Sequence, residues 1–407
     1  MPAESAPDEE RRVVITGVGA IAAAGADAPA VWDALLAGRS ALTPLPPGLL
    51  PRPALAGQIE NYPGPAGVPA DFAARLSRAS QFALDAAIQA IADARIAFTA
   101  ENAYSVASLV GAAHGADPAG PAAPLFSAGL AGASTGLNIA GPSYAINAGA
   151  ASGLVAMLQA AAMIRAGDVH AALAGGAEAP LRPEIIAAYD SLHLLSSQAT
   201  PNALRPFDLL RDGTVLGEGA AIFLLEDREL AVQRGARVYG EILGGAVTAG
   251  PAGDGAPPTD VDIARQAIGR TLRTAGRSPQ EVDLVFTAGG GTQAGDARET
   301  DILERSFGTR ILDMYVTATT PVLGHTIGAS GPLATLAALF ALAQQTVPPH
   351  PTYADPDPDC ALDITVRPQT DHLHSALISA YGSAGQNAAM LIAPHRAERG
   401  DELPVVL

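Results

Sequence analysis

The sequence is poor in several residue types, and each shortage excludes a class of chemistry. No lysine occurs among the 407 residues, so all 24 basic residues are arginine, and neither a Schiff base nor a side-chain ammonium group is available. The one cysteine, Cys360, cannot form an internal disulfide, which favours a reducing, cytoplasmic location. Aromatic residues make up 4% of the chain and hydrophobic residues 48%, so the core is built largely from small side chains.

Positive charge and long apolar runs are also scarce. The formal net charge of −17 repels phosphate backbones and anionic lipids, which predicts neither a nucleic-acid nor a membrane partner. The most apolar stretch, residues 144–167, is interrupted by polar residues and is expected to form a buried strand and helix. Residues 1–12 are acidic and lack the apolar segment of a signal peptide, so they are interpreted as a flexible tail.

Short runs of β-branched or small residues alternate with longer amphipathic runs, which predicts a layered α/β protein. Segment 244–259 is rich in Gly, Pro and Asp and is interpreted as a loop, so a boundary is placed there. The two predicted halves are residues 13–245 and 246–407. The expected strands are 13–19, 108–113, 144–148, 171–177, 220–226, 282–287, 314–318, 375–380 and 388–392. The expected helices are 30–37, 73–94, 151–166, 261–275 and 329–344.

Two motifs have competing interpretations. Gly17-x-Gly19 after a strand is similar to a dinucleotide fingerprint, but no second strand ending in an acid follows about 20 residues later, so a tight turn is favoured. His372 and His374 have the spacing of two ligands on one strand, but no complementary cluster occurs elsewhere in the sequence. No metal site is predicted.

The most informative feature is a turn of very small residues between a predicted strand and a predicted helix, at positions 147–153. Such a turn exposes one side chain at a helix N-terminus, where the helix dipole would activate a thiolate or bind an oxyanion. In this sequence that exposed side chain is a methyl group. A similar stretch, residues 328–331, opens a helix in the second half, which hints at a duplication.

With these features the sequence resembles the β-ketoacyl synthase family over residues 11 to about 394. The segments that carry the resemblance are 11–17, 32–40, 141–143, 174–178, 205–219, 324–331, and Tyr381-Gly382 with Asn387. The resemblance implies a thiolase-like duplicated fold with α-β-α-β-α layers. In active members a cysteine, two histidines and a lysine catalyse decarboxylation and condensation of substrates carried on the phosphopantetheine of acyl carrier protein.

Three of those four catalytic positions are changed in this chain. The resemblance places the cysteine at Ala150, the first histidine at Ala288 and the lysine at Thr320, so that His325 alone is retained. Cys360 lies in a segment similar to a surface loop of the family, and Ser152 is present in active members too. The resemblance therefore implies no catalytic residue and no bound cofactor.

Members that lose the cysteine and keep the fold are chain length factors of type II polyketide synthases, and this is the function that the resemblance implies. Those factors commonly carry glutamine at the position of Ala150, and the connection 114–141 is short for the family. The chain would pair with an active ketosynthase through a strand formed by Tyr144, Ala145, Ile146, Asn147 and Ala148. It would shape the acyl tunnel with Ala112, Ala113, His114 and Ser383, and acyl carrier protein would dock mainly on the partner.

Two other functions remain open at this point. A pseudo-ketosynthase could process acyl groups by cyclisation or dehydration, using His325 with Ser152 or a neighbouring acid. The chain could also be a non-catalytic, homodimeric acyl-binding protein. A neighbouring gene for an intact ketosynthase would favour the chain length factor.

Overall fold

The computed structural model describes residues 11–114, 137–252, 257–258 and 260–395. Most of the predicted flexible tail, and residues 115–136 of the short connection, lie outside the described residues. Arg12, at the end of the predicted tail, is anchored, because its guanidinium donates to both carboxylate oxygens of Glu241.

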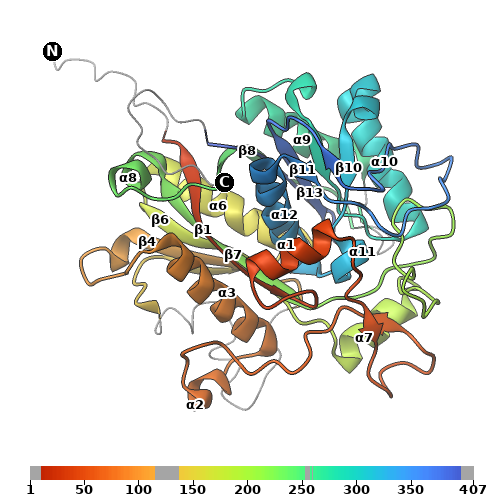
Figure 1. The fold of residues 1–407 in the computed structure, drawn as a ribbon, viewed down its shortest axis with the longest axis horizontal. Helices are drawn as coiled ribbons and strands as arrows, with labels where there is room; N and C mark the ends of the chain where they lie inside the picture. The colour runs from red at the N-terminus through yellow and green to blue at the C-terminus, as the bar shows by residue number, and fades with distance from the viewer. Residues whose placement is uncertain (1–10, 115–136, 253–256, 259, 396–407) are drawn as a thin grey trace.

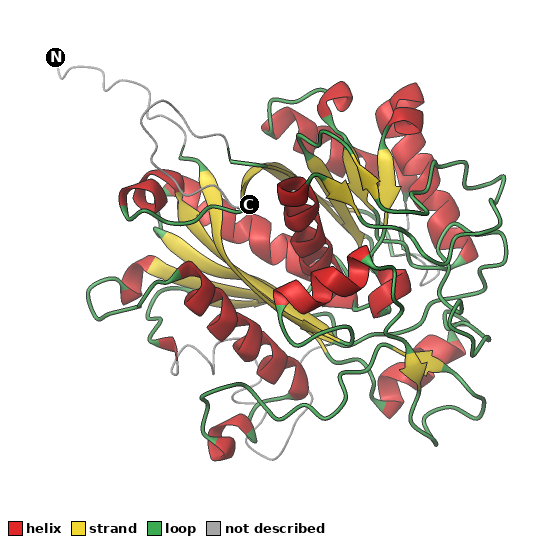
Figure 2. Ribbon diagram, in the orientation of Figure 1, coloured by secondary structure: helices red, strands yellow, loops and turns green. Residues whose placement is uncertain are grey.

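A ten-stranded mixed sheet runs through the molecule in the order β10-β9-β13-β14-β8-β1-β7-β6-β4-β5 (Figure 2). The strands of its first half are β1 (Val13–Ala22), β4 (Val106–Gly111), β5 (Ser143–Ile146), β6 (Ala171–Glu178) and β7 (Gly219–Asp227). Those of its second half are β8 (Gly240–Ala249), β9 (Leu284–Phe286), β10 (Tyr315–Thr317), β13 (Ala376–Tyr381) and β14 (Gln386–Ala393). The halves join where β1 and β8 pair over two residues of each strand. Two small ribbons pair β2 (Thr43–Pro44) with β3 (Leu55–Ala56), and β11 (Thr346–Val347) with β12 (Gln369–Thr370).

The helices and the two halves of this bent sheet together form five layers. In Figure 1, α3 covers the outer face of the first half, while α9 and α10 lie outside the second half. Helices α6 and α12 lie between the two halves and contact strands of both. The α-helices are α1 (Ala28–Leu36), α2 (Ala70–Ala73), α3 (Arg78–Ala94), α6 (Ser152–Ala166), α7 (Pro183–Ser191), α8 (Arg228–Gln233), α9 (Val261–Thr274), α10 (Gln293–Phe307), α11 (Thr320–Leu323) and α12 (Ser330–Gln344). The predicted α-β-α-β-α layering is confirmed.

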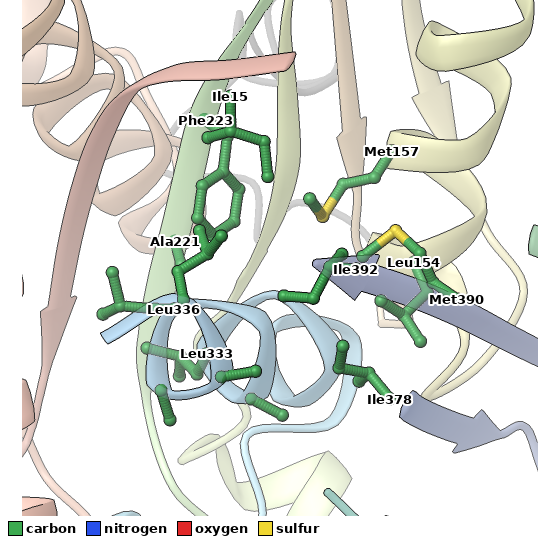
Figure 3. Packing of buried hydrophobic residues seen from close by; sticks show 14 of the residues in the cluster. Ile15, Leu154, Met157, Ala221, Phe223, Leu333, Leu336, Ile378, Met390 and Ile392 are labelled. Carbon is green, nitrogen blue, oxygen red and sulfur yellow. The ribbon is translucent and has the colours of Figure 1, made fainter. Parts of the chain in front are cut away.

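The central layer forms the main core. Figure 3 shows Leu333 and Leu336 of α12 beside Phe223 of β7 on one side and Ile378 of β13 on the other. Two segments, 149–166 and 327–344, are long and apolar enough to cross a membrane, but 61% and 78% of them are buried within the fold. They are therefore core helices, and their apolar character reflects contacts with sheet on both faces.

The sequence interpretation of β1 was wrong at its end. The strand continues to Ala22, and Gly17 and Gly19 lie inside it rather than in a tight turn. A Cβ atom at Gly19 would lie 1.9 Å from the carbonyl oxygen of Ala86, and one at Gly17 would lie 2.2 Å from that of Ala90. These glycines are needed because α3 packs directly on the strand backbone.

The predicted boundary between residues 245 and 246 falls inside β8, so the expectation of a loop from residue 244 was wrong for residues 244–249. A Cβ atom at Gly244 would lie 2.6 Å from the backbone nitrogen of Ala275, and one at Gly245 would lie 2.1 Å from Leu158. The glycines therefore mark close packing of helices on both faces of a strand, a pattern that resembles a loop in composition.

Several helices also differ from expectation: α2, α7, α8, α10 and α11 were not among the predicted ones. The predicted helix 73–94 is divided, because the Ser77 side chain accepts a hydrogen bond from the Ser80 N–H (3.1 Å) and begins α3 at residue 78. Helix α10 was not predicted. Its inward face carries Asp296, Glu299 and Thr300, all buried, and these polar residues interrupt the apolar period that sequence analysis relies on.

We expect Gly19→Ala to lower the free energy of unfolding by ~2 kcal/mol or more, because its methyl group meets a fixed carbonyl oxygen. Urea denaturation measures the change. Gly269→Ala is a matched control, because a Cβ atom there approaches only the flexible end of Arg273, at 3.7 Å, and α9 should gain about 0.5–1 kcal/mol. Equal effects of the two substitutions would contradict this account of β1.

Candidate functional site

The turn before α6 presents Ala150 at the helix N-terminus. Gly149 takes the left-handed conformation (φ 57°), and a Cβ atom there would lie 2.9 Å from Gly382. The hydroxyl of Ser152 accepts from the Ala148 N–H (2.8 Å) and donates to the Gly149 carbonyl (2.5 Å). Ser152 is fully buried, and its hydroxyl is engaged in holding the turn. The turn therefore has the shape expected for a nucleophile, with a methyl group in that place.

Strand β5 leads into this turn and lies at the end of the sheet, paired only with β4. It covers Tyr144, Ala145 and Ile146 of the predicted interface strand. The prediction that the strand continues through Asn147 and Ala148 was wrong. Asn147 accepts from the Gly149 N–H (3.2 Å) and donates to the Ala113 carbonyl (2.9 Å), so the chain turns there.

A cavity of about 360 Å³ opens beside the turn. Its walls come from the ends of β4, β9, β13 and β14, from the turn before α6, and from α7 and α10. The predicted site residues that line it are Ala113, His114, Asn147, Ala150, Ala288, His325 and Ser383. Of the predicted tunnel and catalytic positions, Ala112 and Thr320 are not among its lining. Ala112 packs its backbone beside Gly328, and the buried Thr320 donates to the Gly289 carbonyl (2.7 Å) behind the cavity wall.

His325 is held as a neutral ring. Its backbone bonds to Val215 and Gly217, and its Nδ1 accepts from the Ile327 N–H (3.1 Å). Burial lowers the pKa of His325 to about 4. Since Nδ1 is an acceptor, the proton of the neutral ring lies on Nε2, so this histidine can donate a hydrogen bond into the cavity.

Glu178, at the end of β6, was not singled out by sequence analysis. Its carboxylate accepts from the N–H groups of Ala113 (2.8 Å), His114 (3.3 Å) and Gly328 (3.1 Å). The imidazole of His114 lies 3.4 Å from the same carboxylate and 5.8 Å from the Tyr189 ring, measured between ring centroids. One buried side chain thus fixes the chain after β4 against the loop before α12.

Two further acids were missed at the opposite wall. Glu299 accepts from the N–H groups of Ala288 (2.8 Å) and Gly289 (3.0 Å), and Asp296 accepts from Phe207 (2.9 Å) and Gly291 (3.0 Å). Burial raises the pKa of Glu299 to about 7 and that of Asp296 to about 6, against the lowering effect of these N–H donors. Asp296 and Glu299 are three residues apart, which places them on the same face of a helix, and this spacing was the sequence signal that could have identified them.

The remaining sequence candidates lie elsewhere. Cys360 is fully buried in the second half, and burial raises the pKa of its thiol to about 11. His372 and His374 are both exposed. Within the described ranges, no group of three or more His, Cys, Asp or Glu side chains is placed to hold a metal ion.

The N-terminal domain model of β-ketoacyl synthases matches residues 10–231, and the C-terminal domain model matches residues 239–354. The chain belongs to the β-ketoacyl synthase family. The ketoacyl synthase alpha subunit of the tetracenomycin polyketide synthase of Streptomyces glaucescens is 32% identical, over 95% of this chain and 98% of that protein.

Solved structures support the same assignment. The ishigamide ketosynthase/chain length factor superposes with a TM-score of 0.84 at 27% identity, covering 95% of this chain and 100% of that one. A type II polyketide synthase acyl-carrier protein in complex with its ketosynthase, bound to the hexaketide, gives the same TM-score and coverage at 26% identity. This β-ketoacyl synthase relative therefore has the family's thiolase-like fold, with a methyl group at the start of α6.

The depressed pKa of His325 makes a testable contribution to stability. In the unfolded chain the histidine binds a proton below pH ~6.5, but in the folded chain it binds one only near pH 4. The contribution of neutral His325 to the free energy of unfolding is therefore complete at neutral pH, and it is lost as the pH falls from ~6.5 to about 4. His325→Asn keeps an acceptor for the Ile327 N–H and removes the titration. When the pH is lowered from 7.5 to 5, the free energy of unfolding of the variant, measured by urea denaturation, should rise by ~2 kcal/mol relative to that of the wild type. A pH-independent difference would contradict the buried, neutral ring.

Proposed function

We propose that this chain is a non-condensing chain length factor that pairs with an active ketosynthase and shapes the tunnel for a growing polyketide. The observation that carries the proposal is Ala150 at the N-terminus of α6, in a turn otherwise built for a nucleophile. Ala288 and Thr320 extend the same pattern, since neither side chain can transfer a proton as histidine or lysine does. The similarity to the ishigamide ketosynthase/chain length factor supports it.

Strand β5 supports the pairing. It is an edge strand in which Tyr144 is 52% exposed, and an exposed edge offers unpaired backbone groups to a second sheet. The partner would present its substrates on acyl carrier protein, as the complex with a hexaketide-bound ketosynthase suggests. We propose a cytoplasmic location for the pair, and two thiolase-like halves whose boundary lies before β8 rather than between residues 245 and 246.

An independent acyl-processing activity is less well supported. Ser152, the hydroxyl closest in sequence to the missing nucleophile, donates to one backbone group and accepts from another. Freeing it would leave the Ala148 N–H without a partner in a buried turn, which costs about 1–3 kcal/mol.

The proposal is tested by co-expressing the chain with a ketosynthase that has the intact cysteine, two histidines and lysine. We expect the two to co-purify as a 1:1 complex, and only the ketosynthase to gain an acyl mass after incubation with acyl carrier protein thioesters. A stable acyl adduct on this chain, or a homodimer that ignores the ketosynthase in size-exclusion chromatography, would overturn the proposal.

His114 is the wall residue whose size we expect to set product length. In the reconstituted pair, His114→Trp should shift products to shorter chains and His114→Ala to longer ones. The added ring of tryptophan blocks space that the growing chain would fill, and this steric block outweighs the ~0.8 kcal/mol of apolar contact that each further methylene would gain. Product masses measure the shift. His170→Trp, at an exposed position before β6, is the control. Unchanged products from both His114 variants would remove this residue from the tunnel.

A further inference from the structure

A buried carboxylate lies behind the wall of the cavity and does not line it. Glu178, the last residue of β6, is 1% exposed and is not among the residues that border the cavity. Its Oε2 accepts from the N–H groups of Ala113 (2.8 Å) and Gly328 (3.1 Å), and its Oε1 accepts from that of His114 (3.3 Å). These donors offset the cost of burying the charge. Because Gly328 belongs to the second half of the chain, one carboxylate joins the two halves behind the cavity.

Residue 328 can reach this carboxylate because it is glycine. A Cβ atom at Gly328 would lie 2.7 Å from Oε2 of Glu178 and 3.1 Å from the Cα atom of Ala112. The end of β4, the end of β6 and the loop before α12 are therefore in direct contact around the carboxylate. The absence of a side chain at Gly328 is what permits this approach.

His114 is the residue that the carboxylate holds at the cavity wall. Its backbone is fixed on both sides, since the N–H donates to Glu178 and the carbonyl accepts from Arg182 (3.2 Å). Its imidazole Nδ1 lies 3.4 Å from Oε1 of Glu178, in a geometry that makes no hydrogen bond, so the negative charge acts on a ring nitrogen that is otherwise unpaired. His114 lines the cavity, and its position there depends on a side chain outside the lining.

We propose that Glu178 is a positioning residue for product length: it holds His114 against the cavity, and His114 in turn limits the growing chain. The inference rests on the proposed function for the product, and on the contacts of Glu178 alone for the placement of His114. Glu178→Gln separates the two roles of the carboxylate. The amide oxygen would take the place of Oε2, beside two N–H donors, and the amide NH₂ would face the His114 N–H, where no hydrogen bond can form.

Hydrogen exchange at single-residue resolution tests the placement in the full chain alone. In Glu178→Gln, exchange of the His114 amide should accelerate ~10-fold because its acceptor is lost, while the amides of Ala113 and Gly328 keep theirs and should change less than ~3-fold. Glu218→Gln is the matched control and should leave the His114 amide unchanged, because the buried Glu218 accepts from the Ile59 N–H (3.1 Å) and from Arg78 instead. Equal acceleration of the three amides, or none at His114, would overturn the inference.

Product masses from the reconstituted pair test the consequence. Glu178→Gln should broaden the distribution and raise products one two-carbon unit shorter or longer by ~3-fold or more relative to the main product, because the wall is no longer held in one place. In the His114→Ala background the same substitution should add nothing, since Glu178 acts through His114. Glu218→Gln should give the wild-type distribution.

An unchanged distribution in Glu178→Gln would overturn the inference, and so would an equal broadening in the His114→Ala background or in Glu218→Gln. Failure of the chain to pair with a ketosynthase would overturn the proposed function instead. In that case hydrogen exchange still decides whether Glu178 places His114, so the two failures are distinguishable.

Discussion

Intact-protein mass spectrometry of the Ala150→Cys variant is expected to show one alkyl group after brief treatment with iodoacetamide, whereas the native chain shows none. Position 150 borders the cavity and lies at the N-terminus of α6, where the helix dipole lowers the pKa of a thiol. The native thiol, Cys360, is fully buried, and burial raises its pKa to about 11. A reactivity difference of more than ~100-fold should follow, because the thiolate is the reacting form.

Ala156→Cys is the matched control. Residue 156 lies in α6, six residues after position 150, and is fully buried, so its thiol has neither access nor the N-terminal dipole. Labelling of the native chain, or no labelling of Ala150→Cys, would contradict our description of the turn.

The same variant should remain unable to condense acyl units. If the resemblance places the family's proton-transfer groups correctly at positions 288 and 320, a thiol at position 150 still lacks them, because this chain has Ala288 and Thr320 there. Such groups contribute ~10²–10⁴-fold each to a rate. We therefore expect acylation of the variant by a thioester without release of carbon dioxide from a malonyl thioester. Measurable condensation would show that His325 alone suffices.

Ala145→Pro is expected to separate this chain from the ketosynthase partner that we propose, without unfolding it. The carbonyl groups of Pro142 and Ile146 accept from β4, so by the alternation of a strand the backbone of Ala145 faces the free edge. Proline there removes one outward N–H and keeps the pairing with β4. We expect the dissociation constant of the complex to rise by ~30-fold or more, measured by calorimetry or quantitative pull-down, because a buried carbonyl of the partner loses its donor.

Circular dichroism and the melting temperature of the isolated variant establish that the fold is intact. Leu312→Ala is the control, since Leu312 is 60% exposed in the short helical segment Gly308–Asp313, after α10 in the second half. Undiminished binding by Ala145→Pro would exclude β5 as the contact strand.

The fold could be predicted from the sequence where apolar periodicity and burial agree. The strands β4, β6 and β7 and the helices α6 and α12 have clean small-residue patterns, and their predicted bounds are within two residues of those observed. Periodicity failed where close packing uses glycine, as at Gly244 and Gly245 in β8, because the same residue type also marks loops.

The site was predictable in part. Resemblance to the family led to Ala150, Ala288 and His325, and all three line the cavity. It did not lead to Glu178 or Glu299, because their positions depend on which backbone N–H groups the fold brings to a buried carboxylate. No sequence period encodes that information. Helix α10 has polar residues on its buried face, so its sequence lacks the apolar stripe by which a core-facing helix is recognised, and it was not predicted.

The Glu178 carboxylate has a consequence for how this subunit can evolve. It fixes the chain at Ala113 and His114, where β4 has ended, and the chain on the other side of the short connection is fixed separately, because Ala140 and Gly141 both donate to the Ala103 carbonyl. Because each anchor is held without the other, natural variation in the number of residues between them would leave the cavity wall, the edge strand and the turn at Ala150 in their places.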